Sequence, residues 1–312
     1  MNSDVKFFLL KLALVAGILI LVDFTTGLGL KYFFNKQKVG RYHKVTHAIK
    51  DSREDILIFG NSHAAEHFDA RLMQEITSKT VFNFGNGGLS ILYTYPLVKS
   101  VLYHHSPKLI IVNIDYEELA YYPDAYEVIS IFLPYYNINA VIDSTIALMP
   151  NNEILKCHSN LYRYNSTLGN AVLNTYVKKY TQSSENLGYE PKTGYFCKTA
   201  SVNKKPKQSQ EIKFDQNKIN YLLQLIDAAQ SRNIRLLVTT TPLYQYDAAE
   251  QKIYKQKLQQ ILAKYNVPYL DYGTNPDFYG KCEYFNDNSH LNQSGASKWT
   301  SQCSQYIKSE IL

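Results

Sequence analysis

Residues 56–63, which read ILIFGNSH, are the stretch that most strongly predicts the fold. Four consecutive apolar residues indicate a buried parallel strand, and the glycine that follows predicts a turn. Ser62 is therefore expected at the carboxyl end of a strand, which is where ligands and catalytic groups gather in an open α/β sheet. On its own this pattern is weak, because a serine beside a glycine often marks only a turn.

Residues 287–292, which read DNSHLN, form a second motif near the other end of the chain. A serine hydroxyl becomes a good nucleophile only when a base takes its proton and a third group holds that base. Asp287 precedes His290 by three residues, so one tight turn brings the two side chains together. On its own, Asp287 is equally suited to cap a helix. Together with the first motif, it predicts Ser62 as nucleophile, His290 as base and Asp287 as the carboxylate that orients the base.

Apolar runs alternate with segments of helical periodicity along the rest of the chain. Strands are expected at residues 56–59, 80–84, 109–114, 235–240 and 269–271. Helices are expected from residue 69, over 90–104, 215–232 and 248–265, and from about residue 294. Strand–helix alternation of this kind predicts a three-layer α/β/α, flavodoxin-like fold with a parallel sheet in the order 2-1-3-4-5.

The order of these motifs resembles that of the SGNH (GDSL-type) hydrolases, in particular their membrane-anchored bacterial branch. The first family block, Gly-x-Ser, is similar to residues 60–62, and the last, Asp-x-x-His, to residues 287–290. The second block supplies a glycine whose backbone N–H binds the oxyanion, and it is similar to residues 83–88, NFGNGG. Within that run Gly88 is the better match and Gly85 the alternative.

The third family block, Gly-x-Asn-Asp, has no counterpart, because residues 113–118 read NIDYEE after the third strand. Either Asn61, Asn86 or Asn113 supplies the missing side-chain donor, or the oxyanion hole has only the N–H groups of Ser62 and Gly88. Losing one oxyanion donor typically costs about 2.7–4 kcal/mol of transition-state stabilisation.

Three further residues are candidate substrate ligands. His63 and His67 lie beside the nucleophile and are expected to contact substrate, or else to be solvated on the first turn of a helix. Arg163 could clamp an anionic group or pair with an acidic neighbour. It belongs to a long insertion, about residues 116–214, that we expect to form a substrate-facing cap with helical pieces near residues 138–149 and a lysine-rich loop over 176–213.

Composition limits the chain to one sizeable α/β core with appendages, since it has 312 residues of which 45% are hydrophobic. We expect an N-terminal membrane anchor (1–30), a basic tether (31–53) and a catalytic domain (54–312). Residues 7–22 are apolar apart from Lys11, and about 20 such residues can span a bilayer. A cleaved signal peptide is the alternative, but small residues in the spacing of a cleavage site do not follow. The net charge of +6 is scattered, so no nucleic-acid partner is expected.

The location of the catalytic domain depends on two conflicting signals. Lysine and arginine are more frequent after the apolar segment than before it, which by the positive-inside rule favours the cytoplasm. Four cysteines favour an oxidising compartment, with Cys157–Cys197 and Cys282–Cys303 expected among three possible pairings. Because long domains translocate with little regard to flanking charge, we expect an extracytoplasmic domain. Four reduced cysteines in the cytoplasm are the alternative.

The resemblance implies a serine esterase or acyltransferase without cofactor or metal. Its expected substrate is an acetyl or other short acyl ester of a cell-envelope glycan or acylated polymer. A membrane acyltransferase is the expected protein partner. The missing third block keeps a different class open, a catalytically idle glycan-binding or scaffold domain.

Overall fold

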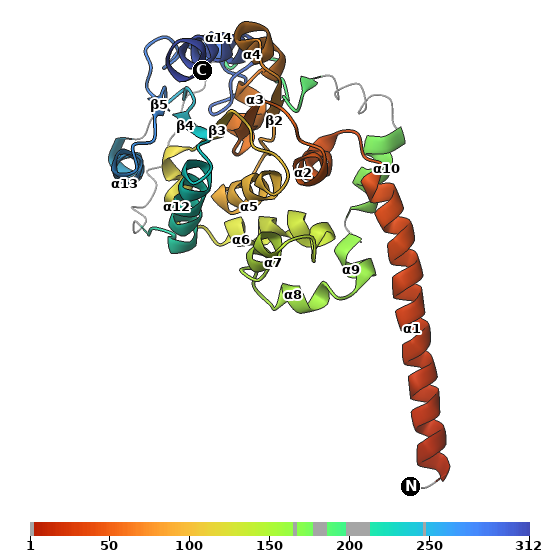
Figure 1. The fold of residues 1–312 in the computed structure, drawn as a ribbon. Helices are drawn as coiled ribbons and strands as arrows, with labels where there is room; N and C mark the ends of the chain where they lie inside the picture. Colours follow the sequence, from red (N-terminus) through yellow and green to blue (C-terminus); the bar gives the residue numbers. More distant parts are fainter. Residues whose placement is uncertain (1–2, 165–166, 177–185, 198–212, 246–247) are drawn as a thin grey trace. The chain divides into compact units, whose positions relative to one another are not determined.

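The computed structural model describes residues 3–164, 167–176, 186–197, 213–245 and 248–312. The chain divides into two compact units. One, the anchor-helix unit, joins Met1–His43 to Ile129–Gln182; the other, the sheet unit, joins Lys44–Val128 to Ser183–Leu312. Figure 1 traces the chain through these elements.

The sheet unit is built on five parallel strands in the order β2-β1-β3-β4-β5, as the alternation of strands and helices predicts. The strands are β1 (Ile56–Phe59), β2 (Val81–Asn83), β3 (Leu109–Asn113), β4 (Arg235–Thr240) and β5 (Tyr269–Asp271). In the register of the central strands, Ile58 pairs with Ile111 and Ile111 with Leu237. All residues of β1 and β3 are buried, which explains their unbroken apolar runs.

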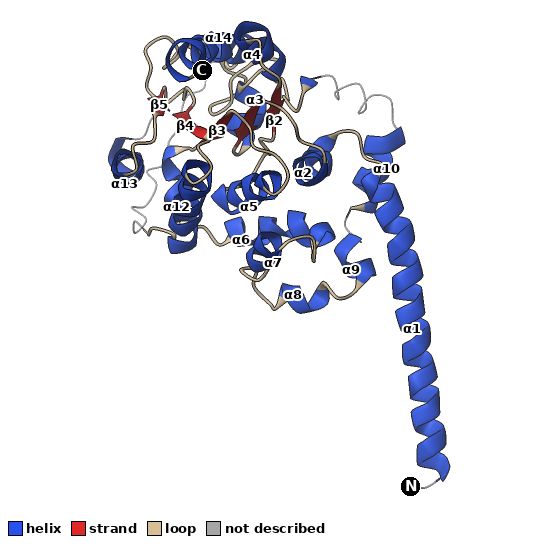
Figure 2. Ribbon diagram, viewed as in Figure 1, coloured by secondary structure: helices blue, strands red, loops and turns tan. Residues whose placement is uncertain are grey.

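Helices cover both faces of this sheet, giving three layers (Figure 2). One face packs against α3 (Ser62–His67), α4 (Ala70–Thr77) and α14 (Gln293–Tyr306), and the fully buried Trp299 lies in that core. The helices α5 (Ile91–Leu102) and α12 (Gln216–Gln230) pack against each other in a second layer. The helix α13 (Ala248–Lys264) follows β4. Asp215 caps α12 by accepting the N–H groups of Asn217 and Lys218, as expected.

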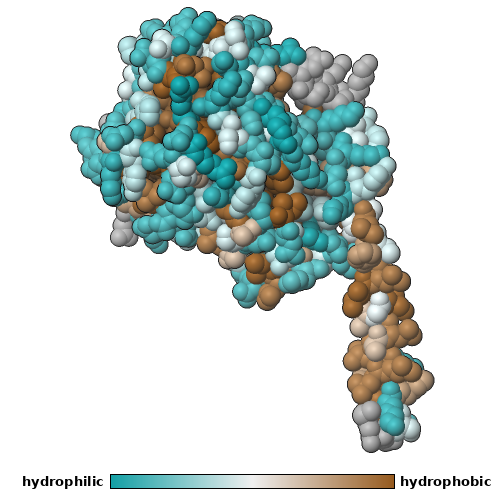
Figure 3. All heavy atoms as spheres, in the orientation of Figure 1, coloured by the Kyte–Doolittle hydropathy of each residue, from teal (hydrophilic) through white to brown (hydrophobic). Residues whose placement is uncertain are grey.

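The anchor-helix unit starts with α1 (Ser3–Asn35), a helix long and apolar enough to cross a membrane. Hydrophobic residues cover most of its visible N-terminal surface, as Figure 3 shows. Such a helix fits a membrane anchor, and a signal sequence would show the same features. Part of the expected basic tether is helical, since α1 continues to Asn35 and α2 spans Gly40–Lys50.

The C-terminal third of α1 is packed inside its unit. The Asp23 carboxylate accepts the N–H groups of Asn160 and Leu161 and the hydroxyl of Ser159, at the start of α9 (Asn160–Tyr164). Phe34 is 2% exposed and contacts the rings of Tyr42, Tyr135 and Tyr164. The end of α1 is therefore a folded part of this unit.

The expected insertion at 116–214 is divided between the two units, because residues 129–182 group with α1. That part contains α7 (Ala140–Ile146), α8 (Glu153–Lys156), α9 and α10 (Leu168–Tyr176). Its start, with α6 (Asp124–Glu127), belongs to the sheet unit. Most of the lysine-rich part lies outside the described residues, and the role of the insertion as a cap stays a prediction.

The expected disulfide pairing is wrong. Cys197 is bonded to Cys282, with Cα atoms 5.0 Å apart, while Cys157 and Cys303 are free and buried. Cys303 points into the core between α14 and the sheet, and Cys157 follows α8 in the other unit. An even number of cysteines therefore does not mean that all of them are paired.

Thiol titration should find two free thiols per chain in protein that is denatured without reduction, and four after reduction. In the native protein we expect almost none to react, because burial raises the pKa of Cys157 to about 11 and also raises that of Cys303. Replacing Cys197 by serine should add one thiol to the unreduced count, whereas Cys157→Ser should remove one. Zero free thiols in the unreduced wild type would refute this pairing.

Candidate active site

The backbone around Ser62 is shaped by the glycine before it. Gly60 has φ +141°, and a Cβ there would lie 2.8 Å from the Asn113 carbonyl oxygen. This requirement for glycine sets the sharp turn from β1 into α3. The Asn61 side chain then accepts the N–H of His63 and caps the helix, so Ser62 lies at the first position of α3.

The structure brings the three expected catalytic side chains into one hydrogen-bonded chain. Ser62 Oγ lies 3.0 Å from His290 Nε2, and His290 Nδ1 lies 3.0 Å from Asp287 Oδ2. Asp287 Oδ1 also accepts the N–H groups of Ser289 and His290, each at 2.8 Å. The same carboxylate therefore shapes the turn and orients the imidazole.

The electrostatic surroundings keep the Asp287 carboxylate ionised. Burial raises its pKa, but the N–H groups of His290 and Ser289 and the His290 ring outweigh this effect, so the pKa is lowered overall. A second carboxylate, Glu66, lies 3.8 Å from His290 Nε2. Glu66 is buried, and it places a second carboxylate on the Nε2 side of the imidazole.

The expectation that His67 contacts substrate is wrong. The ring is fully buried, Nδ1 lies 2.9 Å from Thr241 Oγ1, and Nε2 accepts the N–H of Leu291. Burial, with His63 and His290 nearby, lowers the pKa of His67 well below its usual value. Neutral His67 therefore ties the chain after His290 to α3 and to the end of β4.

The second block makes a close backbone contact with α3. A Cβ on Gly85 would lie 2.3 Å from the Ala65 nitrogen, and the Gly85 N–H donates to Asn83 Oδ1. Gly85 is thus occupied in packing the turn against α3 and is excluded as the oxyanion donor. Gly87 lies beside the nucleophile, since a Cβ on Gly87 would be 3.8 Å from Ser62 Cβ. The role of Gly88, which lines the neighbouring cavity, stays a prediction.

The asparagines expected to replace the third-block donor are engaged elsewhere. Asn61 and Asn113 both donate to the carboxylate of Asp115, at 2.5 and 3.2 Å. Asn86 is buried, and its amide is 3.5 Å from the hydroxyl of Tyr93. The assignment of Asn86 to the oxyanion hole stays a prediction.

His63 is part of a second hydrogen-bonded chain beside the first. His63 Nδ1 lies 2.8 Å from Asp115 Oδ1, and His63 Nε2 lies 2.9 Å from Ser289 Oγ. Its ring meets that of His290 edge to face, with centroids 5.2 Å apart. The two hydrogen-bonded chains draw on the same two segments of sequence, because His63 directly follows Ser62 and Ser289 directly precedes His290.

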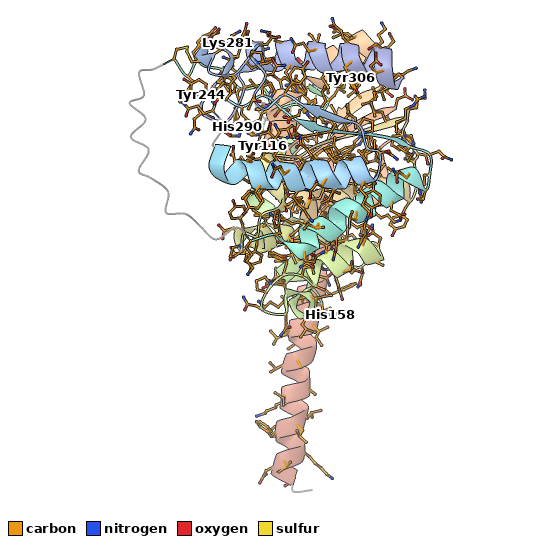
Figure 4. All side chains as sticks on the ribbon, turned by 90° about the vertical axis from the view of Figure 1, so that its left-hand side faces the viewer. Tyr116, His158, Tyr244, Lys281, His290 and Tyr306 are labelled. Atoms are coloured by element: carbon orange, nitrogen blue, oxygen red, sulfur yellow. A yellow bond between two sulfur atoms is a disulfide. The ribbon has the colours of Figure 1, made fainter. Side chains whose placement is uncertain are left out.

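A cavity of about 720 Å³ opens next to these residues in the sheet unit. His63, Ser289 and Gly88 line it, together with polar and acidic side chains, among them Asp115, Glu117, Glu118, Asp124 and Lys218. Figure 4 shows His290 and the cavity residue Tyr116 at the same end of this unit. Desolvation raises the pKa of the half-buried Glu118 to about 7.

Arg163 lies on α9 in the anchor-helix unit, where its guanidinium donates to Asn160 Oδ1 and to the Tyr136 carbonyl. Its role as a substrate ligand stays a prediction. Within the described residues, no group of three histidine, cysteine or acidic side chains could hold a metal ion.

Comparison with known proteins gave matches among solved structures alone. No protein-family model and no curated protein matches the sequence. A protein from Streptococcus pneumonia, provisionally described as a platelet activating factor, has a TM-score of 0.45 at 14% identity over 91% of this chain and 98% of that one. A provisionally assigned lipolytic protein of the G-D-S-L family from Desulfitobacterium hafniense has a TM-score of 0.41 at 10% identity, covering 80% and 97%. An acetyl xylan esterase from Butyrivibrio proteoclasticus has a TM-score of 0.36 at 10% identity, covering 83% and 64%.

These TM-scores are below 0.5, so the assignment rests on the features of the chain itself. Those features are the strand order 2-1-3-4-5, Ser62 directly after β1, and the Asp287–His290 turn directly before α14. The chain has a three-layer α/β/α fold, and these residues lie where the resemblance stated above predicts them. At the position expected for the third block, Asp115 follows β3.

Two residues of this site were not expected from the sequence, Asp115 and Ser289. The position of Asp115 directly after a predicted strand could have indicated its place in the site, because polar side chains at the carboxyl ends of parallel strands meet at the same edge of a sheet. No feature of the sequence indicated the contact of Ser289 with His63, since the two residues are 226 positions apart along the chain.

Proposed function

We propose that this protein is a serine esterase or acyltransferase of the SGNH type that forms an acyl-enzyme on Ser62. The observation that carries the proposal is the continuous chain from Ser62 Oγ through His290 to Asp287. Ser62 attacks the ester carbonyl, His290 takes its proton and later returns it to the leaving oxygen, and Asp287 orients the imidazole. The N–H groups of Ser62 and Gly88 then donate to the oxyanion.

The proposed substrate is an acetyl or other short acyl ester on a cell-envelope glycan. The cavity supports a neutral sugar, because Tyr116 and Tyr122 line it and its polar side chains can bind hydroxyl groups. Its carboxylates outnumber its single lysine, Lys218, which disfavours strongly anionic polymers. A membrane acyltransferase remains the proposed protein partner.

The proposed location is a single-pass membrane protein with an extracytoplasmic catalytic domain. The helical stretch of residues 3–22 is about 30 Å long, which matches the hydrocarbon core, and Asp23 follows it. Packing of Asp23 and Phe34 inside the anchor-helix unit supports an uncleaved anchor. The Cys197–Cys282 disulfide supports an oxidising compartment.

Labelling and burst kinetics test the proposal together. A fluorophosphonate probe should label the wild type and the control Ser301→Ala, whose hydroxyl bonds within α14, but should not label Ser62→Ala. With an aryl acetate, a hydrolase should turn over steadily, whereas a transferase without its acceptor should show a burst of about one equivalent and slow release. Added acetyl-free glycan should then accelerate release. Absence of labelling, burst and turnover in the wild type would favour the idle binding or scaffold domain.

A further inference from the structure

We propose that His63 supplies the third oxyanion donor, through its Nε2–H, in place of the side-chain amide missing after β3. The inference rests on the proposed function of Ser62. It assigns to His63 a direct contact with the reacting carbonyl oxygen, a role distinct from general substrate contact. The carboxylate of Asp115, which follows β3, holds His63 from behind.

The first step concerns what Asp115 can do. An ionised carboxylate accepts hydrogen bonds and cannot donate one, so Asp115 itself cannot stabilise an oxyanion. The carboxylate accepts from Asn61, Asn113 and His63. Burial raises the pKa of Asp115, but these partners, with His63 first, lower it overall. Asp115 therefore stays ionised and fixes Nδ1 of His63 as a donor.

The second step concerns the other ring nitrogen. With Nδ1–H committed to Asp115, Nε2 carries a proton only when the ring is an imidazolium. Burial lowers the pKa of His63, but Asp115, helped by Glu66 and Asp287, raises it overall. The groups facing the ring from neighbouring elements are these three carboxylates and the rings of His67 and His290, at 4.6 and 5.2 Å between centroids. Three carboxylates favour the imidazolium, while neutral His67 adds no charge.

The third step concerns direction. Nε2 points at Ser289 Oγ, 2.9 Å away, and His63, Ser289 and Gly88 line the same cavity. His63 also follows Ser62 directly at the start of α3, and its bonding partner Ser289 directly precedes the base His290. The resting bond to Ser289 is replaced by a bond to the oxyanion during the reaction.

The reaction step balances with this donor. Ser62 Oγ forms a bond to the carbonyl carbon, the π electron pair of the C=O bond moves onto oxygen, and His290 takes the Oγ proton. His63 keeps its proton and donates a hydrogen bond to the new oxyanion. Collapse of the intermediate returns the electron pair to the C=O bond, expels the leaving oxygen and transfers the proton from His290 to it.

Rates of His63 variants test the donor role. Loss of one oxyanion donor lowers kcat about 10²–10³-fold with little change in KM, and we expect this of His63→Ala. His63→Gln, which keeps a neutral donor, should retain part of that rate. The control His105→Gln should match the wild type, because His105 precedes β3 at the other end of the sheet. Melting curves by circular dichroism establish that each variant is folded.

Ser289 and Asp115 separate this role from two others. Ser289→Ala frees Nε2 from its resting bond, so kcat should rise by up to about fivefold. If His63 only positioned the His290 loop, or served as a base that activates Ser289, the same variant should lose activity. The wild-type rate should fall at high pH as His63 loses its proton, and Asp115→Asn should move this fall to lower pH because it removes the carboxylate that raises the pKa.

Full kcat in folded His63→Ala, or loss of activity in Ser289→Ala, would overturn the inference while leaving Ser62 catalysis intact. A wild type without probe labelling or ester turnover would instead refute the proposed function, and the inference with it. If His63→Ala does not fold, the opposite signs expected for Ser289→Ala and the pH shift of Asp115→Asn still decide the matter.

Discussion

Replacing Ser62 by alanine should lower ester turnover by about 10⁴–10⁶-fold, and His290→Ala should have nearly the same effect. Ser62 Oγ and His290 Nε2 are 3.0 Å apart, so the nucleophile and the base act as one unit and neither works without the other. The double substitution should therefore cost little more than either single one. Steady-state rates with an aryl acetate, measured for the two single variants and the double variant, give this comparison.

A melting curve must also show that each of these variants is folded. Ser62 is the first residue of α3, whose cap is the Asn61 side chain, so alanine at position 62 should leave the helix in place. The melting temperature of Ser62→Ala should thus stay close to that of the wild type. Retention of full activity in folded Ser62→Ala would refute the mechanism, and additive losses in the double variant would show that the two residues act separately.

Asp287→Asn should lower kcat by about 10⁴-fold at neutral pH, less than Ser62→Ala does. The carboxylate accepts the Nδ1–H of His290, whereas an amide at this place can donate to Nδ1 and favour the wrong tautomer. Asparagine still offers an oxygen to the N–H groups of Ser289 and His290, so the turn should survive. Asp287→Ala, which loses both functions, should also lower the melting temperature.

A matched acidic residue provides the control for this second experiment. Asp277 pairs with Gln302 on the exposed surface, and Asp277→Asn should leave the rate unchanged. An Asp287→Asn variant with the rate of the wild type would mean that His290 is oriented by other groups, with Glu66 the nearest carboxylate to its Nε2.

Much of the sheet unit could be predicted because its sequence signals are local. The first four residues of β1 and of β3 are apolar and form continuous buried runs, and such runs arise when a strand is covered on both faces. The Asp287–His290 contact is equally local, because three residues in one turn hold both partners. The bounds of β4 and β5 also agree with the sequence-based expectation.

The site around this catalytic chain was predicted less well, because its contacts join distant segments. His67 was expected to contact substrate, yet the fold buries it between Thr241 and Leu291, far away in sequence. The departure of the third block was visible in the sequence, but its consequence depends on Asp115 meeting His63, 52 residues earlier. A pattern along the chain carries no information on which polar side chains become neighbours.

The sequence by itself determined where the strands lie, the turn at Ser62 and the Asp287–His290 unit, since periodicity, glycine conformation and short spacing act within a few residues. Tertiary structure alone decided the pairing of Cys197 with Cys282, the grouping of α1 with residues 129–182, and the contact of His63 with Ser289. These contacts depend on distances in space between segments up to 226 residues apart. Burial and packing of the whole chain set those distances.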